Sequence, residues 1–405
     1  MNRACFTKNT TALASSTKLN LHEQKQHASF IRPIKNNFVR MNTTYIFFNI
    51  LFMLGSATVS GQEEQQAAPA EQKLSATSKY DFIPGESLMF YDDFTQENIG
   101  DFPGLWNTNG SGEIVTTNLF PGRWFKPGAD ADFVPLTQKV FPDNYTVEFD
   151  LLPMQGESED KSFSFGFFIY AAEDPNNLGE GGAVPGLAGI KMHFGDYQHD
   201  YSTYSEGSYN MDGVSEKNPL VLDQKTRCSF WIQKTRIRVY LNEVKIFDLA
   251  KAMLPGLVYN VVRIETGGYS LPLIANFRIA VGAPDMRNKL ITEGKLVTYG
   301  IYFDSGSDKI KPESSGTMRE IANVLKENPT VNVKIVGHTD SDGDDARNLD
   351  LSKRRAISVK NAFVSEYGIE ASRIETDGKG ETVPLVPNST SEGKAKNRRV
   401  ELIKL

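Results

Sequence analysis

A long series of short apolar runs, each bounded by turn-forming residues, constrains the fold of this chain more than any other feature. Between residues 80 and 284 these runs are rich in Val, Ile, Phe and Tyr, and Gly, Pro and Asn separate them. Short runs with this punctuation are typical of the strands of sandwiches and barrels. The clearest runs are 145–151, 164–170, 236–241, 260–265 and 275–280. The sequence therefore predicts an all-β sandwich over residues 80–286, with a hairpin turn at Asn242 and Glu243.

The pattern changes after residue 290, where strand-like and helix-like segments alternate. One segment begins with Pro, which favours the first turn of a helix, and repeats apolar residues at helical spacing. The expected elements are a helix from Pro312 to before Pro329, a strand at 331–335 that Gly337 ends, a helix from about Asn348 to Gly368, and a strand at 399–403. Residues 290–405 are therefore expected to form an α+β domain of βαβαβ order.

The first 61 residues indicate an export leader. An apolar stretch, Tyr45–Leu54, follows three basic residues and precedes small residues near Gly61. About ten apolar residues are too few to cross a bilayer but suit the core of a signal peptide. A signal peptide begins close to its initiator, so we expect Met41 to be the true start. Residues 62–79 are polar, lack apolar periodicity and are expected to form a flexible linker.

Composition and charge exclude several classes of function. The 405 residues include 44 Lys and Arg and 50 Asp and Glu, so the formal net charge is −6. This balance argues against a general nucleic-acid binder, because phosphate contacts need a basic surface. With only Cys5 and Cys228, the chain can build neither a cysteine scaffold nor a Cys-ligated zinc site. We predict no cofactor and no metal.

Four spaced blocks near the end of the chain carry the most specific signal. They are YFDSGSDKI at 302–310, VGHTDSDG at 336–343, NLDLSKRRAISV at 348–359 and GKAKNRRVE at 393–401. Together they resemble the OmpA-like peptidoglycan-binding domain. The resemblance implies non-covalent binding of the diaminopimelate in the peptidoglycan stem peptide, and a place at the periplasmic face of the cell outer membrane. It assigns the family's acidic and basic anchors to Asp340 and Arg355, and its supporting Asn to Asn348.

The chemistry of these residue types fits that ligand. The free end of diaminopimelate is a zwitterion, so its ammonium needs an anion and its carboxylate suits the planar fork of Arg. Asp340 follows a strand and Arg355 lies about two turns into the next helix, so both can face one crevice at the strand's carboxyl end. Alternatively, the two side chains pair with each other as a solvated salt bridge. The predicted binding residues are Asp304, Thr339, Asp340, Asn348, Arg355 and Arg399.

The sandwich segment leaves other functions open. It resembles concanavalin-like or laminin-G-like sandwiches, notably over 236–249. Glu148 and Asp150 share a strand, as the carboxylates of jelly-roll glycan hydrolases do, but retaining hydrolysis needs a second Glu, and Pro153 stands near its place. The simpler interpretation is that both are outward-facing polar residues. His193 and His199 form a weak candidate metal site.

We therefore predict a non-catalytic tether. The C-terminal domain is expected to hold peptidoglycan while the sandwich contacts an outer-membrane protein or a glycan. Besides the hydrolase with a wall-anchoring module, the remaining alternative is an outer-membrane β-barrel over 80–285 with the same periplasmic anchor. Consecutive apolar residues at 164–171 do not alternate as barrel strands do, which favours the sandwich.

Overall fold

The computed structural model describes residues 80–137, 140–155, 162–178, 182–268, 270–282 and 285–405. The expected leader at 1–61 and linker at 62–79 lie outside the described residues. The described residues belong to one compact unit, Leu74–Leu405. None of the helices in these ranges is both long and apolar enough to cross a membrane.

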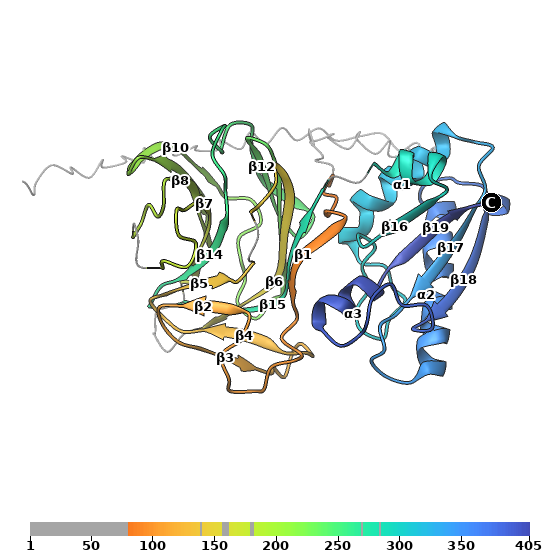
Figure 1. Cartoon of the computed structure of the whole chain (residues 1–405), viewed down its shortest axis with the longest axis horizontal. Helices are drawn as coiled ribbons and strands as arrows, with labels where there is room; N and C mark the ends of the chain where they lie inside the picture. The colour runs from red at the N-terminus through yellow and green to blue at the C-terminus, as the bar shows by residue number, and fades with distance from the viewer. Residues whose placement is uncertain (1–79, 138–139, 156–161, 179–181, 269, 283–284) are drawn as a thin grey trace, which may run out of the picture. The chain divides into compact units, whose positions relative to one another are not determined.

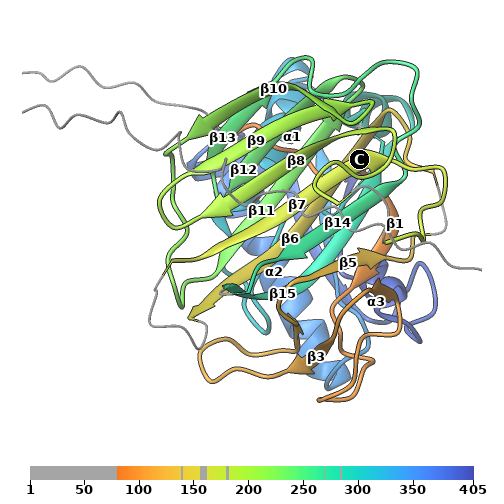
Figure 2. The same ribbon diagram turned by 90° about the vertical axis from the view of Figure 1, so that its left-hand side faces the viewer.

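Strands β1 to β15 form two antiparallel sheets, which lie as two layers in Figure 1. Sheet A has the order β13 (Val244–Leu249), β12 (Arg236–Leu241), β11 (Thr226–Gln233), β6 (Asn144–Gln155), β15 (Ser270–Val281), β4 (Trp124–Pro127) and β3 (Gly112–Val115), with β1 (Ser87–Asp92) also paired to β15. Sheet B has the order β10 (Ser208–Ser215), β9 (His199–Ser205), β8 (Ala188–Gly195), β7 (Ser164–Ala171), β14 (Val261–Thr266), β5 (Ala131–Pro135) and β2 (Trp106–Thr108). Figure 2 shows strands β10 to β7 side by side. The predicted two-sheet sandwich is confirmed.

Aromatic side chains fill the space between the two sheets. Successive side chains of a strand point to opposite faces, so Val147, Phe149 and Leu151 of β6 all point into the core. Phe167 of sheet B and Phe230 of sheet A stack with ring centroids 4.1 Å apart. Such pairs join the sheets by contact area and by ring geometry.

The local expectations for the sandwich hold at the predicted hairpin. The turn Asn242–Glu243 joins β12 to β13. Asn242 has a φ of 52°, a left-handed conformation that Asn adopts more readily than most residues.

The C-terminal part of the chain is a mixed α/β fold around a four-stranded sheet C. Its order is β16 (Lys295–Thr298), β19 (Val400–Lys404), β17 (Val333–His338) and β18 (Ile374–Gly380). Strands β17 and β18 are parallel, and the other neighbours are antiparallel. The helices are α1 (Ser315–Glu327), α2 (Asp345–Ser365) and α3 (Ser391–Asn397), with single turns at η1 (Asn288–Thr292), η2 (Pro312–Ser314) and η3 (Ala371–Arg373). The predicted α+β class is confirmed, but the order is βαβαβαβ rather than βαβαβ, because β18 and α3 are additional elements.

One expectation for this sheet is wrong. Gly337 was expected to end its strand, but β17 continues through it to His338. A Cβ at Gly337 would lie 2.3 Å from the backbone oxygen of Ser352 in α2. The glycine therefore serves close packing of α2 on the strand, not termination of the strand.

Candidate functional site

The six residues predicted to bind a ligand line one crevice. They come from four segments of the C-terminal fold: the loop after β16, the loop after β17, helix α2 and the residue before β19. The residues are Asp304, Thr339, Asp340, Asn348, Arg355 and Arg399. The structure therefore brings together side chains that lie up to 95 positions apart in the sequence, from Asp304 to Arg399.

Asp340 lies two residues beyond the end of β17 and is one of the carboxylates that line this crevice. Its side chain is 11% exposed, and Oδ2 lies 2.5 Å from Nη1 of Arg398. Oδ1 accepts a hydrogen bond from the backbone N–H of Asp342 at 3.2 Å. The ion pair of Asp340 is thus with Arg398 and not with Arg355, the partner in the salt-bridge alternative.

Arg355 extends from α2 over the first of the four blocks. Nε donates to the backbone oxygen of Ser307 at 2.9 Å, and Nη2 donates to that of Asp304 at 3.1 Å. The guanidinium carbon lies 4.8 Å from the centre of the Phe303 ring. Burial lowers the pKa of Arg355 to about 10, with Arg398 and Arg354 acting in the same direction and Asp340 against it. Arg355 is held by neutral groups, so a carboxylate bound there would satisfy its charge.

Of the other predicted residues, Asn348 contacts Asp340 and Asp304 contacts Arg355. Asn348 Nδ2 lies within hydrogen-bonding distance of the backbone oxygens of Asp340 and Asp342, at 3.3 and 3.0 Å, and donates to Glu381 at 2.7 Å. Thr339 is buried, and its Oγ1 has no hydrogen-bond partner among the described residues. Asp304 contributes its backbone oxygen to Arg355 rather than its carboxylate.

Arg399 and Arg398 make different contacts. Arg399 Nε donates to Glu401 at 2.8 Å and its side chain is 1% exposed, so it stabilises β19 from within. Arg398 is the residue that sequence reasoning left out of the binding set, although it contacts Asp340 directly. Only Arg399 was predicted from the sequence, and both arginines line the crevice.

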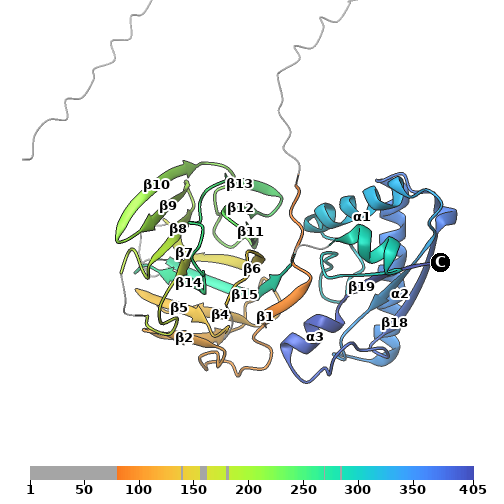
Figure 3. The same ribbon diagram turned by 45° about the horizontal axis from the view of Figure 1, so that its top comes forward.

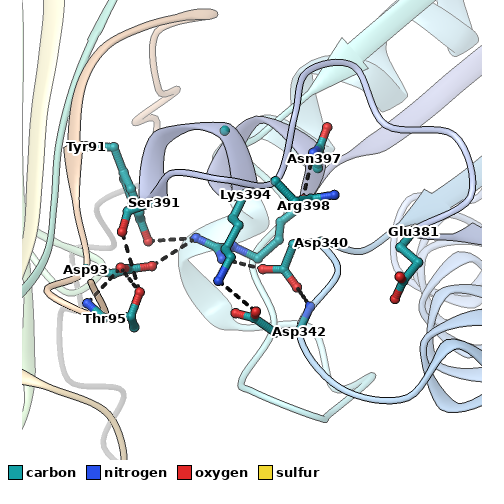
Figure 4. Close-up of polar contacts among 12 residues, drawn as sticks. Tyr91, Asp93, Thr95, Asp340, Asp342, Glu381, Ser391, Lys394, Asn397 and Arg398 are labelled. Carbon is teal, nitrogen blue, oxygen red and sulfur yellow. Dashed lines mark hydrogen bonds and ion pairs between the residues drawn. The ribbon is translucent and has the colours of Figure 1, made fainter. Parts of the chain in front are cut away.

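The crevice has a second wall, formed by the sandwich. Figure 3 shows α3 beside β1, and Figure 4 shows Tyr91, Asp93 and Thr95 facing Arg398 and Ser391. Arg398 Nη2 donates to the Tyr91 hydroxyl at 2.9 Å and lies 3.5 Å from Asp93 Oδ2. No sequence pattern linked these sandwich residues to the C-terminal blocks.

The strand carboxylates considered for hydrolysis are engaged elsewhere. Glu148 and Asp150 face away from the core as expected, but both are buried rather than solvent-facing. Glu148 accepts from Arg278 at 2.6 Å, from Arg227 at 3.1 Å and from the Tyr302 hydroxyl at 2.6 Å. Burial opposes ionisation, but the two arginines and Tyr302 hold the pKa of Glu148 below its usual value. These contacts describe an ion-pair network rather than an acid and nucleophile pair.

The two histidines considered as metal ligands are each within hydrogen-bonding distance of protein oxygens. His193 Nδ1 lies 3.0 Å from Asp200 Oδ1, and His199 contacts the backbone oxygens of Lys217 and Asn218 through Nε2. Within the described ranges, no group of three or more His, Cys, Asp or Glu side chains is arranged to hold a metal ion.

The fold and the crevice define a class of protein: a β-sandwich followed by a mixed α/β domain with a charged crevice. Residues 302–398 match the model of the OmpA family. The probable lipoprotein YiaD of Escherichia coli K12 is 47% identical over 102 residues, which cover 25% of this chain and 46% of that protein. Residues 302–398 are therefore an OmpA-family domain, preceded by a large all-β region of two antiparallel sheets.

Other relatives match a similar share of the chain's length. Outer membrane porin F of Pseudomonas aeruginosa is 40% identical over 111 residues, covering 27% of this chain and 32% of that protein. The structure of the peptidoglycan-associated lipoprotein from Burkholderia pseudomallei aligns at 26% identity with a TM-score of 0.26, covering 30% of this chain and all of that one. The chain spans less than half the length of the two curated relatives.

Proposed function

We propose that this protein is a cell-envelope anchor that binds peptidoglycan through the diaminopimelate of the stem peptide. The observation that carries the proposal is the pair of opposite charges in one crevice: Asp340 as the receptor for the ammonium and Arg355 for the carboxylate. Asn348 fixes the loop that holds Asp340. The OmpA-family match over the same residues supports this assignment.

In this proposal the sandwich is the part of the protein that the C-terminal domain tethers to the cell wall. The names of the relatives, a probable lipoprotein and an outer membrane porin, support a place in the cell envelope for this chain as well. We propose that the protein is exported and acts at the periplasmic face of the outer membrane. There it would tether its sandwich, and an outer-membrane protein or glycan bound to the sandwich, to the wall. In this proposal the protein is a tether without catalytic residues.

Co-sedimentation with purified sacculi tests the binding site. Replacing either Asp340 or Arg355 by Ala removes one charged contact, worth about 1.5–3 kcal/mol, and should lower the affinity for diaminopimelate-type sacculi tenfold or more. Glu366→Ala and Lys326→Ala are matched controls, because both side chains are exposed and lie outside the crevice.

Two results would contradict the proposal. Equal pelleting of the wild type, Asp340→Ala and Arg355→Ala would remove the site assignment. Equal pelleting of the wild type with sacculi whose stem peptides carry lysine in place of diaminopimelate would remove the ligand assignment, because lysine lacks the free carboxylate that Arg355 is proposed to bind.

A further inference from the structure

The anion proposed to receive the ligand's ammonium is already neutralised by the chain itself. Asp340 and Arg398 form a charge-assisted hydrogen bond of 2.5 Å, and Arg398 Nη1 thus stands where a ligand ammonium would stand. A ligand cation can reach Asp340 only if this guanidinium moves or shares the carboxylate. This inference rests on the proposed function.

Residues of the sandwich hold the other side of Arg398. Its Nη2 donates to the Tyr91 hydroxyl at 2.9 Å, its guanidinium carbon lies 5.5 Å from the centre of the Tyr91 ring, and Asp93 Oδ2 is 3.5 Å away. Burial alone would lower the pKa of Arg398, but Tyr91, Asp340 and Asp93 raise it above its usual value. Arg398 is therefore a permanent cation between two carboxylates from different folds (Figure 4).

Asp93 is fixed in place and stays charged. Its Oδ1 accepts from the backbone N–H and the hydroxyl of Thr95 at 3.2 and 2.7 Å. The Thr95 hydroxyl lies 3.5 Å from that of Ser391 at the start of α3. Burial alone would raise the pKa of Asp93, but Thr95, Ser391 and Arg398 hold it below its usual value. Asp93 can thus keep Arg398 paired when Asp340 takes another cation.

We propose that Arg398 is a displaceable internal competitor for the ammonium site, and that Tyr91 and Asp93 of the sandwich set the affinity of the C-terminal domain for peptidoglycan. In the free protein Arg398 pairs with Asp340. In the bound protein the diaminopimelate ammonium pairs with Asp340, and Arg398 remains with Asp93 and Tyr91. Leaving the Arg398 guanidinium without a partner would be unfavourable, because its side chain is only 33% exposed. The contacts with Tyr91 and Asp93 therefore favour its displacement from Asp340. Tyr91 and Asp93 are positioning residues, because they act on the ligand through Arg398.

Three variants of the full-length protein test this proposal, because two should lower the affinity for the ligand and one should raise it. The probe is a soluble disaccharide–tripeptide that ends in diaminopimelate, with its dissociation constant measured by isothermal titration calorimetry. Asp93→Asn and Tyr91→Phe weaken the hold on the displaced Arg398 and should lower the affinity about threefold to tenfold. Arg398→Gln removes the competing charge and should raise the affinity by a similar factor. Asp196→Asn, at an exposed carboxylate of the sandwich, is the matched control and should leave the affinity unchanged.

Each contrary result is informative. Lower affinity in Arg398→Gln would overturn the inference, because Arg398 would then be a contact for the ligand and not its competitor. Unchanged or higher affinity in both Asp93→Asn and Tyr91→Phe would also overturn it. Thermal unfolding of each variant shows whether it is folded. If Asp93→Asn proves unstable, Tyr91→Phe still tests the inference, because it keeps the ring and removes only the hydroxyl. Failure of the proposed function looks different: Asp340→Ala would then bind the muropeptide as the wild type does.

Discussion

Asp92, the last residue of β1, is a carboxylate in surroundings that favour its neutral form. It is buried, and it accepts hydrogen bonds from the backbone N–H of Phe94 at 2.8 Å and from Nε1 of Trp106 at 3.0 Å. Burial raises the pKa of Asp92 to about 7, because it outweighs these two hydrogen bonds, and the charges of Asp93 and Glu97 add to the rise. The folded protein therefore takes up a proton here that the unfolded chain releases.

This shift predicts how stability depends on pH. Between the unfolded pKa of about 3.9 and the folded pKa of about 7, the folded state binds the extra proton, so the free energy of unfolding falls as the pH rises through this window. Asp92→Asn cannot titrate. The free energy of unfolding of the wild type minus that of Asp92→Asn should decrease steadily when both are measured by urea unfolding at pH 4.5, 5.5, 6.5 and 7.5. Taking this difference cancels the contributions of the other titrating groups. A difference that stays constant over these pH values would contradict the prediction.

At the scale of the elements, a pair of glycines lets α2 lie directly on sheet C. Gly337 of β17 pairs in register with Gly378 of β18. A Cβ at Gly337 would lie 2.3 Å from the backbone oxygen of Ser352, and one at Gly378 would lie 2.4 Å from the backbone nitrogen of Lys353. Both distances are far below van der Waals contact. The position of α2, and with it that of Asn348 and Arg355, thus depends on glycine at both positions, where any larger side chain would clash with the helix.

Gly337→Ala should displace α2 from the sheet. The backbone of Ser352 cannot yield as a flexible side chain would, so overpacking should lower the free energy of unfolding by about 1–3 kcal/mol and weaken peptidoglycan binding as well. Gly267→Ala is the matched control, because a Cβ there would meet open space. Equal stability of Gly337→Ala and the wild type in urea unfolding would show that α2 does not need this contact.

The elements that sequence reasoning found are those with a strong apolar period. Helix α1 buries Met318, Ile321 and Leu325 on one face, and its predicted end before Pro329 is close to the observed one. Helix α3 has no such signal, because its buried residues are Ser391, Gly393 and Asn397. Strand β18 contains two glycines and only one apolar residue, so its sequence lacks the apolar alternation of a strand. Its pairing with β17 is visible only in the structure.

The residues of the candidate site also divide into those that a local sequence pattern predicts and those that it does not. Asp340, Arg355 and Asn348 lie in recognisable blocks, so the sequence placed them near one crevice. The choice of Arg398 over Arg399 as the partner of Asp340 depends on how the chain turns from α3 into β19. That turn is set by contacts with residues far away in the sequence, including Tyr91, and local spacing carries no information about it.

At the scale of the whole described unit, one ionic network joins sheet A to the OmpA-family domain. Glu148 of β6 accepts from Arg227 of β11, Arg278 of β15 and Tyr302, the first residue of the family match. Arg227 also donates to Asp150 at 3.1 Å. A buried network of this kind stabilises a structure only when all its members are satisfied, so loss of one donor affects the rest.

Tyr302→Phe should therefore loosen the connection between the two folds. The variant keeps the ring but removes a 2.6 Å hydrogen bond to a buried carboxylate, which should cost about 1–3 kcal/mol. Because Arg227 and Arg278 still neutralise Glu148, each fold should survive by itself, and the loss should fall on their coupling. In scanning calorimetry we expect the wild type to unfold in one transition and Tyr302→Phe in two, the earlier one shifted to lower temperature. Tyr197→Phe, at an exposed tyrosine of the sandwich, should unfold as the wild type does. A single unshifted transition for Tyr302→Phe would mean that contacts elsewhere, such as those of Arg398 with Tyr91 and Asp93, are sufficient to couple the two folds.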